Sequence, residues 1–346
     1  MKIKKALIFF ITLAIGLAVF SLMSGEVQWD DVWKSLSIIR WWQALILFLL
    51  MASSMIFTTL CWKTILGKKK DSISFLNLLK IYTVGFTLGY LTPISLIGGE
   101  ALKAYLLHQK LKISWKKSIV SIVIQEIIDF LILVMVLTIG LGAFFFLGGR
   151  LSKKLGLLMV IILFAIFLFF FSILTKSSKH RSLIGGLIRL IGLEQILETE
   201  QMKTVLNYEQ EGLRFFNSRR HDFWRATGFT ALAYLFYFFQ SFFLVYLLSG
   251  HWMLVGGFIV QAFSTLGSLM LLPASLGSLE MMEGFAFQAL GLSLGLALTF
   301  SLLWRGIRLV VCFFGGVIFL WLTRNLAREK LKKVQDLYLY GKSKDS

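Results

Sequence analysis

Long apolar segments alternate with short polar, mostly basic segments along most of the chain. Runs of about 20 apolar residues are typical of membrane-spanning helices. Two apolar stretches, residues 75–107 and 254–292, are interrupted by Pro and Gly and therefore predict helices that break within the membrane. The uninterrupted runs predict membrane-spanning helices over residues 5–24, 41–62, 118–148, 155–175, 224–248 and 294–323.

The composition agrees with this pattern. Of the 346 residues, 57% are hydrophobic and 16% are charged, whereas a soluble domain carries about 25% charged residues. We therefore expect an all-α polytopic membrane protein with a single transmembrane domain over residues 1–330 and a basic cytoplasmic tail over 331–346. The first predicted helix resembles a signal sequence, but its apolar run exceeds a usual signal core, so we expect it to remain uncleaved.

The net charge of +18 comes from basic residues in the segments between the predicted helices. Lys and Arg beside membrane spans mark the cytoplasmic side and attract anionic headgroups, so the expected partners are membrane lipids and not nucleic acid. Basic residues at both ends place both termini in the cytoplasm, in a bacterial or archaeal cell (inner) membrane. The segment 103–117 is expected on that side, with segment 176–225 as an amphipathic helix on the same surface.

An eight-residue sequence recurs in the two halves of the chain. Each copy has Pro, Ser, Leu and Glu at the same four positions, and the copies end at Glu100 and Glu280. Proline removes a backbone donor from a helix, and glycine permits turns that other residues do not. The residues expected to break the helices are Pro93, Gly98, Gly99, Pro273 and Gly277.

A charged pair follows each copy at nearly the same distance. Glu126 and Asp129 lie 33 and 36 residues after the first proline, whereas Arg305 and Arg308 lie 32 and 35 residues after the second. Residues three apart share one face of a helix. At about 1.5 Å per residue, each pair lies roughly 16 Å along its helix, near the middle of the membrane.

Two interpretations of these pairs remain open. The acids and bases either neutralise each other across an axis between the halves, or they form a polar binding site. In a binding site, Arg305 and Arg308 would hold a phosphate, because a planar guanidinium bonds two oxygens at once, and the acids would take an amine or a proton. Glu100 and Glu280, in the first turn of the returning half-helices, would either offset the helix dipole or line the cavity.

Charge counting places the first broken segment on the cytoplasmic side and the second on the outside. This predicts two inverted repeats, about residues 40–148 and 224–323, each with a broken, re-entrant helical hairpin. Inverted repeats with broken helices are the architecture of many secondary transporters, whose substrate site lies near the membrane midplane.

Few residues favour other kinds of chemistry. The four His residues have no metal-ligand spacing, and no phosphate-binding loop or nucleophile elbow occurs, so we expect no metal, no cofactor and no catalytic residues. Cys61 and Cys312 lie in apolar spans and are expected to be packing residues. The aromatic cluster 234–243 is expected to face lipid or to pack between helices.

Around the repeated motifs the chain resembles the transmembrane region of the lysylphosphatidylglycerol synthase family, the flippase part of the multiple peptide resistance factor. The resemblance covers residues 5–328. Its first half is carried by the first motif copy, the sequence Leu-Lys-Ala-Tyr-Leu-Leu after it, and Glu126-x-x-Asp129. Its second half is carried by Leu272-Pro273-x-x-Leu276-Gly277-x-x-Glu280 and Arg305. Lys103 departs from the arginine expected at its position.

The resemblance implies translocation between leaflets of an anionic or aminoacylated phospholipid, such as aminoacylated phosphatidylglycerol, or of a lipid-linked molecule. Movement would be downhill or driven by an ion gradient. We expect no lysyl transfer, because the soluble transferase domain of the family has no counterpart in this sequence. The alternatives are a lipid-modifying enzyme, for which no nucleophile or metal cluster is found, and a scaffold for a separate lipid-modifying or glycosyl-transferring synthase. Homo-oligomerisation also remains open.

Overall fold

The computed structural model describes residues 21, 29–37, 39–67, 73–92, 95–146, 157, 161–165, 167–168, 200–269 and 275–342. These residues contain α-helices and no strand, which confirms the predicted all-α class. The helices are α2 (Trp29–Ser37), α3 (Trp41–Leu66), α4 (Phe75–Leu91), α5 (Ser95–Leu111), α6 (Trp115–Phe146), α10 (Glu200–Ser218), α11 (Arg220–Ser249), α12 (Leu254–Leu269), α13 (Ser278–Ala289) and α14 (Leu294–Lys342).

Four of the described helices are long and apolar enough to cross a membrane, namely α3, α6, α11 and the part of α14 up to Arg324. They coincide with four of the predicted spans. α14 continues in a polar sequence to Lys342, beyond the predicted end at residue 323. The predicted spans 5–24 and 155–175 lie largely outside the described residues.

Local capping chemistry sets several of the helix ends. The hydroxyl of Ser114 accepts a hydrogen bond from Lys117 N–H (3.4 Å) at the start of α6, and that of Ser293 accepts one from Leu296 N–H (3.3 Å) at the start of α14. At the other end of α11, Gly250 has a φ of 73°, a left-handed conformation that glycine adopts at no steric cost.

Two short hairpins, α4–α5 and α12–α13, are held together by close backbone approach. A Cβ atom at Gly99 would collide with the carbonyl oxygen of Gly85 across α4 and α5, and one at Gly267 would lie 2.8 Å from the carbonyl oxygen of Ser278 across α12 and α13. Small residues permit such contacts between apolar helices. This corrects the expected role of Gly98 and Gly99, since both lie inside α5 and not in a break.

Pro93 and Pro273 fall outside the described residues, so the predicted break at each proline remains a prediction. Gly277 does occupy a turn, because it precedes α13 with a φ of 80°. Only glycine adopts this conformation readily. The sequence therefore predicted the role of Gly277 but not that of the two glycines in the first copy.

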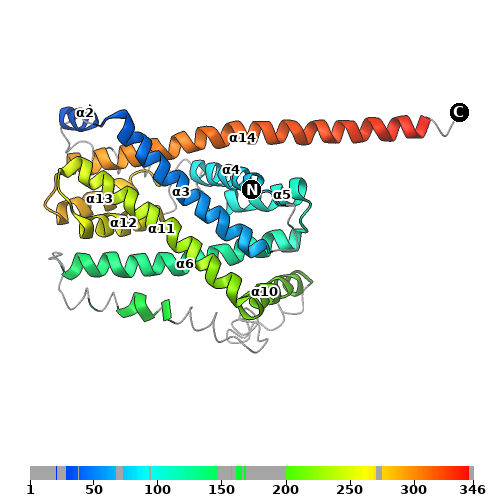
Figure 1. The fold of residues 1–346 in the computed structure, drawn as a ribbon, viewed down its shortest axis with the longest axis horizontal. Coiled ribbons are helices and arrows are strands. Elements are labelled where there is room, and N and C mark those ends of the chain that lie inside the picture. Colours follow the sequence, from blue (N-terminus) through cyan, green and yellow to red (C-terminus); the bar gives the residue numbers. More distant parts are fainter. Residues whose placement is uncertain are drawn as a thin grey trace.

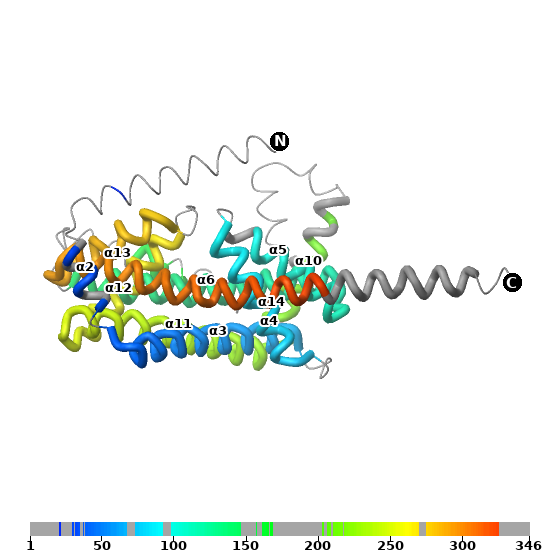
Figure 2. Tube along the Cα trace, turned by 90° about the horizontal axis from the view of Figure 1, so that it is seen from above, coloured from blue at the N-terminus to red at the C-terminus, as the bar shows by residue number. Residues whose placement is uncertain are grey.

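Helices of the two halves pack against each other in a reciprocal pattern. α3 packs along α11, α4 along α14, and α12 along α6. Figure 1 shows that α3 and α11 run in opposite directions, as do α6 and α14, and that the two hairpins occupy opposite ends of the molecule. Viewed from above, α3 and α11 lie side by side on one edge, with α5 and α13 toward the other (Figure 2).

Apolar clusters lie at both ends of this arrangement. One joins α3, α4 and α5 through Trp62, Leu78 and Leu107, each fully buried. Another joins α11, α13 and α14 through Leu244, Phe287 and Trp304.

The helix α10 lies within the predicted amphipathic segment 176–225, of which residues 176–199 are outside the described part. It is tied to α6 by an ion pair of 2.9 Å between Lys116 and Glu211. Just after it, Arg219 donates to the carbonyl oxygens of Thr64 (2.9 Å) and Ile65 (2.8 Å), which satisfies acceptors at the C-terminal end of α3.

Candidate functional site

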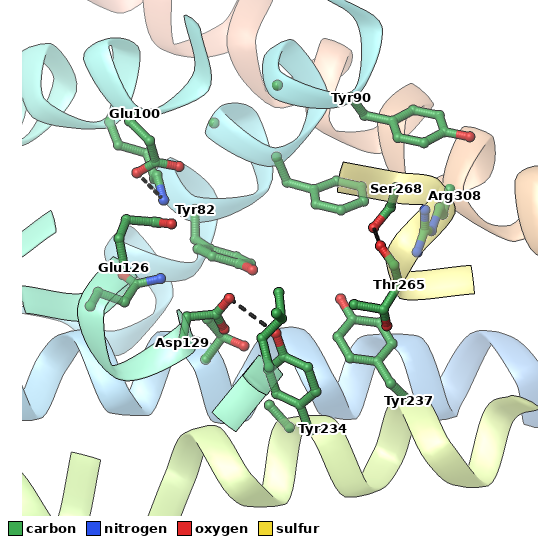
Figure 3. Close-up of a pocket in the computed structure, with 18 of the residues that line it drawn as sticks. Tyr82, Tyr90, Glu100, Glu126, Asp129, Tyr234, Tyr237, Thr265, Ser268 and Arg308 are labelled. Atoms are coloured by element: carbon green, nitrogen blue, oxygen red, sulfur yellow. Dashed lines mark hydrogen bonds and ion pairs between the residues drawn. The ribbon is translucent and has the colours of Figure 1, made fainter. Parts of the chain in front are cut away.

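A polar cavity of about 340 Å³ lies where the two halves meet. Its lining comes from α3, α4, α5, α6, α11, α12 and α14, and from Ser275 just before α13. Figure 3 shows two sides of different character: Glu100, Glu126 and Asp129 lie on one side, and Arg308 lies on the other. Non-helical backbone and ionisable groups at membrane depth are tolerated against protein or a water-filled cavity.

On the acidic side, Glu100 of α5 forms an ion pair of 2.6 Å with Lys103, one turn further along the same helix. The side chain of Lys103 is only 3% exposed, and its ammonium lies 5.3 Å from the ring centre of Tyr82 and 5.6 Å from that of Trp62. Aromatic faces stabilise a cation. The sequence counted Lys103 only among the basic residues of segment 103–117 and did not predict its burial, because α5 carries the residue into the cavity wall.

Glu126 and Asp129 of α6 line the same side of the cavity. The hydroxyl of Tyr234 donates a hydrogen bond of 3.1 Å to Asp129, which ties α11 to α6. Glu126 forms no hydrogen bond or ion pair within the described part of the chain. The acidic side therefore holds three carboxylates and one buried lysine, an excess of negative charge.

On the opposite side, Arg308 of α14 lies between two aromatic rings. Its guanidinium carbon is 5.2 Å from the ring centre of Trp304 and 5.8 Å from that of Tyr90. Its Nε is buried without a hydrogen-bond partner in the described residues. Thr265, Ser268 and Ser275 complete this side with hydroxyl and carbonyl groups.

Arg305, one turn before Arg308, is engaged differently. Its Nε and Nη2 donate to the two carboxylate oxygens of Glu280 at 3.0 Å each, and Nη2 also donates to the carbonyl oxygen of Ser275 at 3.0 Å. Glu280 is buried, with 1% of its side chain exposed, and Arg305 is largely buried, with 11% exposed. Glu280 in turn accepts the N–H of Gly277 at 2.8 Å. The pair thus joins the start of α13 to α14.

These contacts bear on the two interpretations of the charged pairs. The ion pair of Arg305 is with Glu280 of its own half, so this pair does not provide the neutralisation across the axis. Of the predicted site residues, Glu100, Glu126, Asp129 and Arg308 line one cavity, while Glu280 and Arg305 form the ion pair next to it.

Glu283 was missed by the sequence analysis. It is fully buried on α13 and accepts hydrogen bonds from the hydroxyls of Ser264 (2.7 Å, α12) and Ser301 (α14). The spacing in the sequence could have revealed it, because Glu283 lies three residues after Glu280, just as Lys103 lies three residues after Glu100. Its carboxyl group links α12, α13 and α14 at one point.

Tyrosines of the cavity were also missed. Tyr82 and Tyr90 come from α4, and Tyr234 and Tyr237 from α11. The aromatic cluster 234–243 was expected to face lipid or to pack between helices; Tyr237 does pack against two apolar clusters, but the cavity that both Tyr234 and Tyr237 line was not predicted. Their phenol groups add further polar edges to the wall, as amphipathic rings commonly do.

The comparison with protein families gives one match that covers most of the chain. The model described as "Lysylphosphatidylglycerol synthase TM region" matches residues 9–316, which include every cavity residue named above. No match was found among curated proteins. The long apolar helices and the family match together identify a multi-pass membrane protein. The chain therefore belongs to the lysylphosphatidylglycerol synthase transmembrane-region family.

Proposed function

We propose that this protein translocates phospholipids between the leaflets of the membrane, and that it prefers headgroups carrying both a phosphate and an amine. The observation that carries the proposal is the separation of charge within one cavity, with carboxylates on one side and Arg308 on the other. The family match supports a role in lipid modification or flipping.

The two sides of the cavity suit the two charges of such a headgroup. Arg308 would bond two phosphate oxygens, because its planar guanidinium presents parallel donors and its Nε has no partner in the described residues. Glu126 and Asp129 would receive the amine. Three carboxylates against Lys103 and Arg308 leave one excess negative charge when all are ionised, which favours aminoacylated phosphatidylglycerol over unmodified phosphatidylglycerol.

We further propose that the two halves, α3–α6 and α11–α14, are inverted repeats. Each half begins with a long helix, continues with a short hairpin and ends with a long helix, and the packing between them is reciprocal. Ser114 precedes Glu126 by the same twelve residues that separate Ser293 from Arg305, and both serines cap their helices. Such repeats permit a central site to open to each side in turn.

The proposal can be tested with purified protein in liposomes. Fluorescent analogues of phosphatidylethanolamine, alanyl-phosphatidylglycerol, lysyl-phosphatidylglycerol and phosphatidylglycerol would be placed in one leaflet, and their transfer measured by quenching from outside. We expect the protein to accelerate transfer of the three amine-bearing lipids at least several-fold more than that of phosphatidylglycerol. Transfer no faster than in protein-free liposomes for all four lipids would reject translocation and favour the scaffold alternative.

A further inference from the structure

A second cavity of about 380 Å³ adjoins the first and is almost entirely apolar. It lies along α6, with Glu100 of α5 at its edge. Val123, Glu126, Ile127 and Phe130 are spaced as one stripe of a helix, and they line this groove. Val123 is 49% and Phe130 42% exposed. α6 is long and apolar enough to cross a membrane, and exposed apolar side chains on such a helix are expected to face the acyl chains of the bilayer.

Glu100 and Glu126 line both cavities. The two carboxylates therefore mark the boundary between a polar chamber and a lipid-facing groove. Glu126 is the twelfth residue of α6, roughly 16 Å from the helix start at about 1.5 Å per residue. A carboxylate at this depth is costly unless it meets water or a cation, and no residue in the described part of the chain bonds to Glu126.

The corresponding position in the second half is closed. There, Arg305 replaces Glu126 in the last helix of the half and bonds Glu280, the counterpart of Glu100, through two oxygens. This ion pair ties α13 to α14. In the first half, the equivalent pair is Glu100 and Glu126, two like charges that repel each other at any pH where both are ionised. The first half thus lacks the bond that joins the hairpin to the long helix.

We infer that the groove between α5 and α6 is a lateral portal, in which an acyl chain of a lipid with an amine-bearing headgroup lies against Val123, Ile127 and Phe130 while its headgroup passes between Glu100 and Glu126. This inference rests on the proposed function and names the path by which its substrate reaches the cavity. Glu100 is already paired with Lys103, so the amine supplies the positive charge that Glu126 lacks, and the acyl chain never has to leave an apolar environment.

The portal is tested directly by photolabelling. Phosphatidylethanolamine with a diazirine in mid-chain would be incorporated into liposomes holding the full-length protein, and adducts mapped by mass spectrometry after illumination. Met135 and Ile139, at 47% and 43% exposure, are matched controls on the same helix. We expect adducts on the stripe 123–130 to exceed those at the controls at least threefold. Equal labelling of the two regions would overturn the inference.

A blocking substitution separates the portal from the proposed function. Val123→Trp places a large ring in the groove from an exposed position, so folding should be retained, and Ile139→Trp is the matched control. We expect Val123→Trp to reduce both acyl photolabelling of the stripe and lipid transfer at least fivefold, with Ile139→Trp near wild type. If wild-type protein transfers lipid and Val123→Trp leaves transfer and labelling unchanged, the portal is wrong and the function stands.

If instead wild-type protein transfers no lipid, the proposed function fails, and the labelling pattern still decides whether the groove binds an acyl chain. The headgroup preference gives a third, independent reading. The same diazirine on phosphatidylglycerol, which has no amine, should label the stripe less than phosphatidylethanolamine in the wild type. Glu126→Gln should remove that difference, and a difference that persists in this variant would show that Glu126 does not recognise the amine.

Discussion

Two arginines one helical turn apart have different surroundings in this protein. Arg305 is bound to Glu280 through both carboxylate oxygens, so its charge is neutralised within the protein. Arg308 lies between aromatic rings on the wall of the cavity, with one nitrogen buried and without a partner in the described residues. The same residue type therefore serves structure at one position and is open to a ligand at the other.

The Arg305–Glu280 pair should contribute strongly to stability. Removing one member leaves the other buried and unpaired, which costs about 3–5 kcal/mol. We expect Arg305→Ala and Glu280→Ala each to lower the free energy of unfolding by about that amount, and the double variant to lose much less than the sum. SDS-induced unfolding in mixed micelles measures all four free energies. Additive losses would show that the two side chains do not interact.

Glu283 gives a second prediction at this scale. Its carboxyl accepts hydrogen bonds from Ser264 and Ser301, so Glu283→Gln keeps an acceptor for one of them, whereas Glu283→Leu leaves both hydroxyls unsatisfied. An unsatisfied buried group costs about 1–3 kcal/mol. We expect the leucine variant to melt at a clearly lower temperature than the glutamine variant in detergent. The reverse order would mean that the hydroxyls find other partners.

The sequence identified the acids and bases of the cavity because ionisable residues inside apolar runs are visible without a structure. It did not identify the partner of Arg305 or the burial of Lys103. Partner choice depends on how α13 and α14 approach each other, and spacing along the chain does not reveal this. Tyr234 and Tyr237 were missed for the same reason, since a tyrosine in a span looks alike whether it faces lipid or a cavity.

At the level of elements, the helices pack through glycines placed where two backbones meet. A Cβ atom at Gly315 of α14 would collide with the hydroxyl of Thr87 on α4, and one at Gly140 of α6 would collide with the Cβ of Ala262 on α12. These contacts join the last helix of each half to the first hairpin helix of the other. Small residues at such crossings are what allow apolar helices to associate in lipid.

The neighbouring glycines Gly315 and Gly316 allow a matched test. A methyl group at Gly316 would meet no atom within 4 Å, whereas one at Gly315 would collide with Thr87. Gly315→Ala should therefore lower the free energy of unfolding by about 1–3 kcal/mol, the usual cost of overpacking. Gly316→Ala should be neutral or slightly stabilising, because alanine favours helix. Unfolding of both variants in detergent measures the difference, and equal effects would argue against tight α4–α14 packing.

The four described spans were predicted from the hydrophobic runs alone, because an apolar run of this length is typical of a membrane-spanning helix. The start of α5 at Ser95 was not, because glycines within a membrane helix look like breaks until the facing helix is known. Gly99 is small so that α4 can approach, and only the pairing of α4 with α5 reveals this. The prolines and most of the predicted spans 5–24 and 155–175 lie outside the described residues.

At the level of the whole molecule, the two halves pack reciprocally around one cavity, with their hairpins at opposite ends. In the second half, Glu280 and Arg305 form an ion pair that joins α13 to α14. The equivalent residues of the first half, Glu100 and Glu126, are both acidic. This asymmetry fits a conformation open toward lipid on the side of α5 and α6 and closed on the side of α13 and α14.

The proposed inverted repeats predict which parts face each side of the membrane. Ser114 and Ser293 cap the starts of α6 and α14 and are exposed. In a background with Cys61 and Cys312 replaced by alanine, we expect Ser293→Cys to react with an impermeant maleimide in intact cells and Ser114→Cys to react only after permeabilisation. Labelling of both cysteines from outside would contradict inverted repeats.

The central claim, that a lipid headgroup crosses the membrane through this cavity, is tested most directly by lipid transfer in an Arg308 variant. Purified Arg308→Ala would be compared in liposomes with Arg308→Lys and with Arg324→Ala, an arginine on the exposed surface of the same helix. The account predicts at least tenfold slower transfer for Arg308→Ala, partial retention for Arg308→Lys and wild-type transfer for Arg324→Ala, with equal yields of folded protein. Transfer by Arg308→Ala at the wild-type rate would contradict it.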